Sequence, residues 1–186
     1  MKVKEVIKEA AFLVGDEEVV SALESGETVT DEEVQKRIDA LLNCYNLILH
    51  ETATEYLPIR KTAPVNGGKT EYSALPYPAI EVIGVYDGCG KAVEYKTFPS
   101  YFVAEDSAAT VVYDAAPNEQ ALADDFAYAD TRIGKRVFAY GVACEYCLIT
   151  GRYAEAGNFN QKYRAGAEGA PVRKGRIIRR AKTWGI

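Results

Sequence analysis

Apolar residues recur at helical spacing over the first 26 positions of the chain. In a first run they stand three or four positions apart and stop at Gly15, and a second run with the same spacing begins at Asp16 and stops at Gly26. This spacing places the apolar side chains on one face of a helix, and glycine often ends a helix. The pattern therefore predicts two short amphipathic helices. Their apolar positions are Val3, Val6, Ile7, Ala10, Val14, Val19, Val20 and Leu23.

A longer helix is predicted next. Thr30 and Glu33 have the spacing of a capping box, in which a hydroxyl and a carboxylate satisfy backbone N–H groups of the first turn. Helical spacing then continues to Tyr56, where Leu57-Pro58 disfavours helix because proline lacks an N–H and restricts the residue before it. The apolar positions of this helix include Val34, Ile38, Leu41, Leu42, Tyr45, Ile48 and Leu49.

The middle of the chain changes to short β-rich runs separated by turn residues. Four runs are close enough in sequence to pair as an antiparallel meander, because the connections leave no room for the crossover helix that parallel pairing needs. The sequence predicts a small antiparallel sheet here. The runs are Ile80 to Tyr86, Ala92 to Tyr95, Tyr101 to Ala104 and Thr110 to Tyr113.

Helices are predicted again after residue 129. Asp130 is the expected N-cap of a helix that ends at Gly151, and a last helix carries Tyr153, Ala156 and Tyr163. The two helices make a hairpin. The segment before them, residues 116–129, is ambiguous between a loop and a weak helix.

Together these elements predict an α+β protein. It is mainly a helical bundle, residues 1–57 and 130–168, with an antiparallel β insertion at 58–115 and an extended basic C-terminal arm at 169–186. No apolar run approaches the roughly 20 residues that a membrane span needs, and the first eight residues are charged where a secretory peptide would be apolar. We therefore expect a cytosolic protein with no membrane partner. Four cysteines are too few for a disulfide scaffold in 186 residues, so we expect them to be reduced and packed as small apolar side chains.

Charge is distributed unevenly along the chain. From Arg173 onward there are six basic residues and no acidic one, whereas 16 basic and 27 acidic residues precede it, a net charge of −11. Such asymmetry is typical of an interaction arm, although a solvated terminus is the alternative. Aliphatic residues and the only tryptophan favour the interaction arm. The candidate docking residues are Arg173, Lys174, Arg176, Ile177, Ile178, Arg179, Arg180, Lys182 and Trp184.

Residues able to support catalysis are few. His50 is the only histidine and has no distinctive neighbours, so we interpret it as a surface or packing residue. Cys144 and Cys147 form a C-x-x-C inside a predicted helix, without the second pair that a zinc finger needs. The glycines of Asp87-Gly88-Cys89-Gly90 lie between two strands, where a tight turn explains them. We expect no enzymatic activity, no metal and no cofactor.

One segment carries a family resemblance. Residues 142–156 read Val-Ala-Cys-Glu-Tyr-Cys-Leu-Ile-Thr-Gly-Arg-Tyr-Ala-Glu-Ala, and Phe159 and Tyr163-Arg164 follow. This resembles the C-terminal helical hairpin of phage head-tail connector (adaptor) proteins, where an alanine-rich helix ends in a Tyr-Cys-Leu-like triplet and a glycine. In that family the next helix opens with Tyr-x-Glu-Ala. The N-terminal helices and the run from Tyr56 into strands containing Pro78-Ala79-Ile80 are similar to members with a β insertion.

The resemblance implies a structural protein of the virion neck, assembled in the host cytoplasm. It would form a ring, commonly of twelve subunits, below the portal protein, extend the DNA channel and offer a platform to the next neck or tail-completion protein. DNA would pass without sequence-specific binding, and an acidic body would repel rather than hold it. Asp124, Asp125 and Asp130 are candidate channel-facing acids, and the basic arm is the candidate element for docking to the portal or to a ring neighbour.

Two alternatives from other classes remain. One is a small cytosolic enzyme or ligand-binding protein with a tyrosine-lined pocket in the β region, and the other is a nucleic-acid-binding module that uses the basic arm. The state of assembly tests the first alternative: a compact monomer with an enclosed pocket would favour an enzyme or ligand-binding protein, and a ring would exclude it. A steep salt dependence of DNA affinity would support the second alternative. The candidate pocket tyrosines are Tyr72, Tyr77, Tyr86, Tyr95 and Tyr101.

Overall fold

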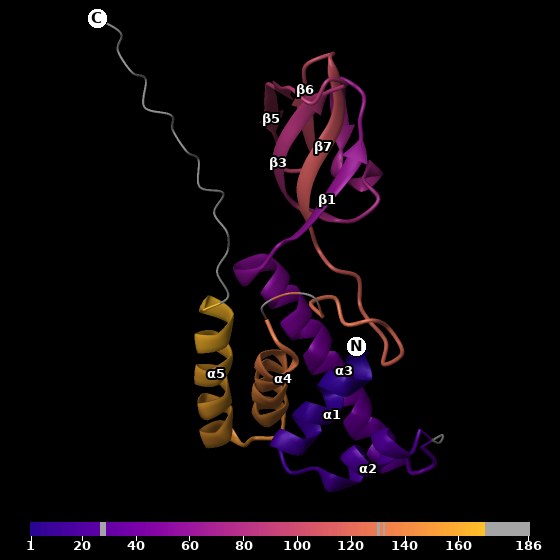
Figure 1. The fold of residues 1–186 in the computed structure, drawn as a ribbon, viewed down its shortest axis with the longest axis vertical. Helices are drawn as coiled ribbons and strands as arrows, with labels where there is room; N and C mark the ends of the chain where they lie inside the picture. The colour runs from indigo at the N-terminus through magenta and orange to yellow at the C-terminus, as the bar shows by residue number, and fades with distance from the viewer. Residues whose placement is uncertain (27–28, 130, 132, 170–186) are drawn as a thin grey trace, which may run out of the picture.

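The computed structural model describes residues 1–26, 29–129, 131 and 133–169 (Figure 1). These residues form five α-helices and two antiparallel β-sheets, so the predicted α+β class is confirmed. Figure 1 shows the strands gathered at one end of the molecule and the helices at the other. Each of the two parts has its own hydrophobic core.

The two N-terminal helices form where the sequence predicts them. α1 spans Val3–Leu13 and α2 spans Glu17–Ser25. The Asp16 carboxylate accepts the backbone N–H of Val19 at 3.2 Å and so caps α2. Gly15 and Gly26 follow the two helices with φ of 76° and 70°, a left-handed conformation that glycine adopts without strain.

The start of the third helix differs from the prediction. α3 spans Glu32–Glu51, and its N-cap is Asp31, whose carboxylate accepts the N–H groups of Glu33 at 2.8 Å and Val34 at 3.4 Å. The predicted capping box of Thr30 and Glu33 is therefore wrong. The aspartate accepts both donors, so the helix begins one residue later than a threonine cap would place it.

The end of this helix widens before the chain enters the strands. A π-helical turn, η1 (Thr52–Tyr56), continues α3, and the N–H of Leu57 donates to the carbonyl of Thr52 at 2.8 Å. The helix thus extends to Tyr56 as predicted. The hydroxyl of Thr52 is buried and lies 3.0 Å from the Tyr163 hydroxyl, which ties this turn to the last helix.

Seven strands make the two sheets. They are β1 (Ile59–Pro64), β2 (Gly68–Glu71), β3 (Ala79–Asp87), β4 (Ala92–Val93), β5 (Tyr95–Thr97), β6 (Tyr101–Ala104) and β7 (Ala108–Ala115), with a short 3-10 turn, η2 (Tyr72–Ala74), after β2. One sheet has the order β1-β7-β3-β4 and the other β2-β6-β5. All four predicted runs contain strands, but the predicted simple meander is wrong. β6 and β7 are consecutive and do not pair, because β7 lies between the long strands β1 and β3 while β2 takes the free edge of β6.

A close backbone approach fixes the turn between β1 and β2. A Cβ at Gly67 would lie 2.2 Å from the Cα of Asp106, far inside van der Waals contact. Gly67→Ala should therefore destabilise the protein by about 1–3 kcal/mol, the usual cost of overpacking, as measured by urea denaturation. Gly88→Ala is the matched control, because a Cβ there meets no atom within 4 Å. Equal midpoints for the two variants would contradict this account of the turn.

Residues 116–129 form an irregular segment with turns and no helix, which answers the ambiguity left by the sequence. The segment passes beside the start of the chain, where Val3 donates to the carbonyl of Asp124 at 3.0 Å and Phe126 donates to that of Met1 at 2.9 Å. Gln120 accepts a hydrogen bond from the Tyr45 hydroxyl at 2.6 Å. These contacts hold residues 116–129, which connect the strands to α4, against the N-terminal helices.

The predicted hairpin consists of α4 (Lys135–Ile149) and α5 (Tyr153–Glu168). Gly151 has a φ of 76° and ends α4 as expected. The N-cap of α4 is Gly134 and has no side-chain capping bond, so the expected cap at Asp130 is wrong, and Asp130 itself lies outside the described residues. The helices approach closely, since a Cβ at Gly166 would lie 2.6 Å from Val137. We call α1–α5 the helical body.

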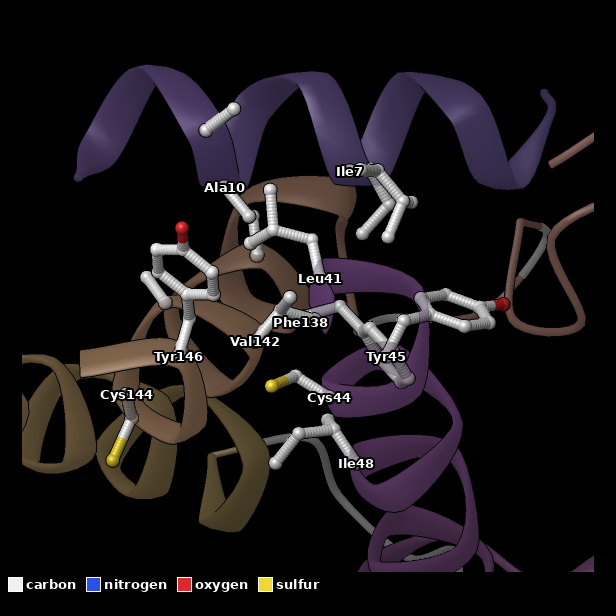
Figure 2. Close-up of a cluster of buried hydrophobic side chains, with 14 of the residues drawn as sticks. Ile7, Ala10, Leu41, Cys44, Tyr45, Ile48, Phe138, Val142, Cys144 and Tyr146 are labelled. Atoms are coloured by element: carbon white, nitrogen blue, oxygen red, sulfur yellow. The ribbon is translucent and has the colours of Figure 1, made fainter. Parts of the chain in front are cut away.

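The core of the helical body lies between α1, α3 and α4 (Figure 2). Leu41 is fully buried there, and Phe138 and Val142 of α4 pack beside it. Aromatic rings extend this core toward the irregular segment, since Phe138 lies 5.2 Å from Tyr45 and 5.0 Å from Phe126 between ring centroids. The predicted apolar stripe of α3 thus faces inward.

Candidate docking surface

The residues considered for catalysis are not brought together. His50 is exposed at the end of α3, and its carbonyl accepts the hydroxyl of Thr54 at 2.8 Å. Within the described residues, no group of three or more His, Cys, Asp or Glu side chains is arranged to hold a metal ion. None of the helices in this part of the chain is long and apolar enough to cross a membrane.

Three of the four cysteines are buried in the helical body. Burial raises the pKa of the Cys44 thiol to about 12 and that of Cys144 to about 11, and it also raises the pKa of Cys147. In Figure 2 the Cys44 sulfur points into the packed layer beside Val142, whereas the Cys144 sulfur points away from it. Cys89 is exposed in the turn after β3, so the expectation that every cysteine packs among apolar side chains is wrong there.

Thiol reactivity should follow this division. A disulfide exchange reagent should modify one thiol of the native protein, Cys89, rapidly at pH 8, because only the thiolate attacks and burial keeps the other three thiols protonated. All four should react after denaturation. The count of modified thiols by absorbance or mass checks this. Rapid modification of a second thiol in the folded protein would contradict the burial of Cys44, Cys144 and Cys147.

The tyrosines of the β region do not surround one cavity. Tyr72 and Tyr95 line an open pocket with Phe98 and Pro99. Tyr77 lines a different one, where the amine of Lys61 lies 4.8 Å from its ring centroid. Tyr101 stacks on Phe98 with ring centroids 4.7 Å apart, and Tyr86 is half-buried on β3.

The described channel-facing candidates have partners within the chain. The Asp124 carboxylate accepts the N–H of Ala121 at 2.7 Å. Asp125 pairs with Lys2 at 3.0 Å, and the hydrogen bond from Lys2 lowers the pKa of the Asp125 carboxyl. The third candidate, Asp130, and all nine candidate residues of the basic arm lie outside the described residues.

A surface that the sequence reading did not single out lies at the end of the helical body away from the strands (Figure 1). Two turns meet there together with the helix ends beside them, residues 12–20 around the turn between α1 and α2 and residues 148–153 around the turn between α4 and α5; we call these two segments the distal end. Arg152 joins them by donating from Nη1 to the carbonyl of Val14 at 3.0 Å. An open pocket lies between them, lined by Val14, Gly15, Asp16, Glu17, Glu18, Arg37, Tyr146, Thr150 and Arg152.

Arg37 of α3 organises the acidic side of this pocket. Its Nη1 donates to the Asp16 carboxylate at 3.2 Å, and its Nη2 pairs with Glu18. The hydrogen bond to Glu18 raises the pKa of Arg37, so the side chain holds its charge. Glu17 is exposed and lines both this pocket and a second pocket of the distal end.

Large apolar side chains are exposed at the same end. Phe12 is 70% exposed, Ile149 63% and Tyr153 71%, and Leu148 is exposed beside them on α4. Phe12 and Val20 line a second open pocket, which shares Gly15, Asp16 and Glu17 with the first. Burial of such surface against a partner would be favourable.

Three acidic side chains line the pockets beside these apolar residues: Asp16, Glu17 and Glu18. The stretch from residue 16 to residue 39 contains nine acidic and two basic residues. Two sequence signals mark this surface: the acidic stretch, and the position of Phe12 on the polar face of an amphipathic helix. The distal end is thus an apolar surface with an acidic rim, suited to a basic and apolar partner.

No protein-family model and no curated protein matches the chain.

Proposed function

We propose that this chain is a structural subunit of a tailed-phage neck, a head-to-tail connector that forms a ring below the portal and extends the DNA channel. In this proposal the helical body is the ring-forming part, the strands are an insertion, and the basic arm docks in the assembled neck. Its partners are the portal protein, other copies of itself and the next neck or tail-completion protein. The chain catalyses no reaction and acts in the virion.

The observation that carries the proposal is how the hairpin residues divide between core and surface. Cys147 and Ala156, which belong to the family-like motif, are buried in the core of the helical body. Leu148 and Tyr153 of the same motif are 42% and 71% exposed. Packing within the subunit does not require large apolar residues at exposed positions, whereas contact with another subunit does.

The net negative charge of the chain before the basic arm agrees with the role of a channel for DNA. The chain before Arg173 has a net charge of −11. A protein that binds DNA neutralises phosphates with lysine and arginine, and a net negative body repels the backbone instead. A channel wall of this charge lets DNA pass without holding it.

The test is the assembly state of the full chain. Native mass spectrometry, alone and with the portal, should detect a closed ring of identical copies. Its interfaces should each bury more than about 2,000 Å² in total, as obligate assemblies do, because a neck holds against pressurised DNA. A chain that stays a monomer in both conditions, or that touches its neighbours only through small wet contacts, contradicts the proposal.

A further inference from the structure

The arm and the distal end complement each other in charge and polarity. Residues 173–186 combine six basic side chains with Ile177, Ile178 and Trp184. The distal end offers Phe12 and Val20 in an open pocket with an acidic rim. Tryptophan and arginine are the side chains most often dominant in interfaces, and charge complementarity fixes orientation and excludes wrong partners.

The arm begins at the opposite end of the helical body. α5 has 16 residues and runs from the distal end to the turn η1, where Tyr163 packs edge-on against Tyr56 with centroids 5.8 Å apart (Figure 1). A helix of this length spans about 24 Å. The arm must therefore cover at least that distance to reach a distal end, whether its own or a neighbour's.

The length of the chain after α5 permits this. From residue 170 to Trp184 there are 15 residues, and such a chain reaches about 50 Å when extended. After the length of α5 is subtracted, about 26 Å remain for crossing to an adjacent subunit in the same orientation. A second copy whose distal end lies within this distance can therefore be reached by the arm.

We propose that the basic arm of one subunit docks on the distal end of a second copy, with Trp184 in the pocket beside Phe12 and basic side chains against the acidic rim. The proposal rests on the proposed ring, because the ring supplies an adjacent second copy. Each subunit then gives one arm and receives one, a head-to-tail contact that closes a ring.

A complementation experiment separates the two halves of this contact. One variant of the full chain carries Phe12→Asp, which spoils the pocket but keeps the arm and Trp184. The other ends at Pro171, which keeps the pocket but removes the only tryptophan. Titrating the second into the first should shift Trp184 emission to shorter wavelength and produce complexes of two different chains. Phe12 is 70% exposed, so the substitution should leave the folded subunit intact.

Two controls make the result specific. A truncated chain that also carries Phe12→Asp should bind at least about tenfold more weakly, as expected for loss of an aromatic anchor. A truncated chain with Ile80→Asp, a change at a 43% exposed residue of β3, should bind as the plain truncation does. Equal binding by the Phe12→Asp truncation would overturn the proposal.

Failure of this inference differs from failure of the proposed function. If the wild-type chain forms rings but the titration gives no shift, the arm does not dock here and the ring stands. A shift that the dilute wild-type chain already shows at every concentration would mean that the arm binds its own subunit, which also overturns the proposal. If the titration succeeds and no ring ever forms, the docking stands and the neck function falls.

Discussion

Replacing Leu41 by alanine should lower the free energy of unfolding by about 2–5 kcal/mol, the range for large-to-small changes in packed cores. Leu41 is fully buried at the centre of the helical body, between residues of α1 and α4 (Figure 2). Removing its side chain loses the transfer free energy of the buried carbons and leaves a cavity that the helices fill only partly. Urea denaturation followed by circular dichroism measures the change.

The same helix provides the control. Leu47 is 60% exposed, so Leu47→Ala should change the free energy of unfolding by no more than about 0.5 kcal/mol. Similar losses from the two substitutions would contradict the packing direction of α3. The Leu41→Ala protein that remains folded should still join an assembly, because Leu41 is buried away from the surface.

Ending the chain at Pro171 should leave the melting temperature nearly unchanged and abolish incorporation into the assembled neck. The described helices and strands already bury two hydrophobic cores, to which we expect the arm to add little. Association, in contrast, depends on the apolar side chains of the arm, since burial contributes about 25 cal/mol per Å² and an exposed ion pair contributes at most about 1 kcal/mol. Calorimetry and co-purification with the portal measure the two effects.

The full-length chain permits a finer version of this experiment. Serine at Ile177, Ile178 and Trp184 should reduce incorporation more than glutamine at three of the basic residues. A truncated chain that still incorporates, or a charge variant that loses more than the apolar variant, would show that the arm is not the docking element or that charge dominates its binding.

Local signals explain what the sequence predicted well. The helices α1 and α2 are set by apolar spacing and by the glycines at 15 and 26, each of which acts within a few residues. The stop at Pro58 is also local. The choice between Thr30 and Asp31 as N-cap was missed because adjacent residues both have capping side chains, and only the geometry of the first turn decides between them.

Strand pairing could not be read in the same way. β1 and β7 pair although Ile59 and its partner Ala115 are 56 positions apart in the sequence. Such a pairing depends on which edges remain free after folding, and no short window of sequence carries that information. The predicted neighbour pairings are confirmed for β3 with β4 and for β5 with β6, but the predicted pairing of β6 with β7 is wrong.

The distal end was missed for a related reason. Phe12 and Ile149 belong to helices that are far apart in the chain, and the contact of Arg152 with Val14 brings their turns together. Each residue alone reads as an ordinary exposed apolar side chain. Only the folded helical body shows that they share one end with Asp16, Glu17 and Glu18.

Electron cryo-microscopy of a tailed particle that contains this chain tests the neck proposal most directly. The proposal predicts a closed ring of identical copies below the portal, each with the fold of the helical body, around an opening that duplex DNA passes. A particle whose neck lacks this chain, or a purified chain that is a compact monomer with a small molecule enclosed in its β region, would contradict it.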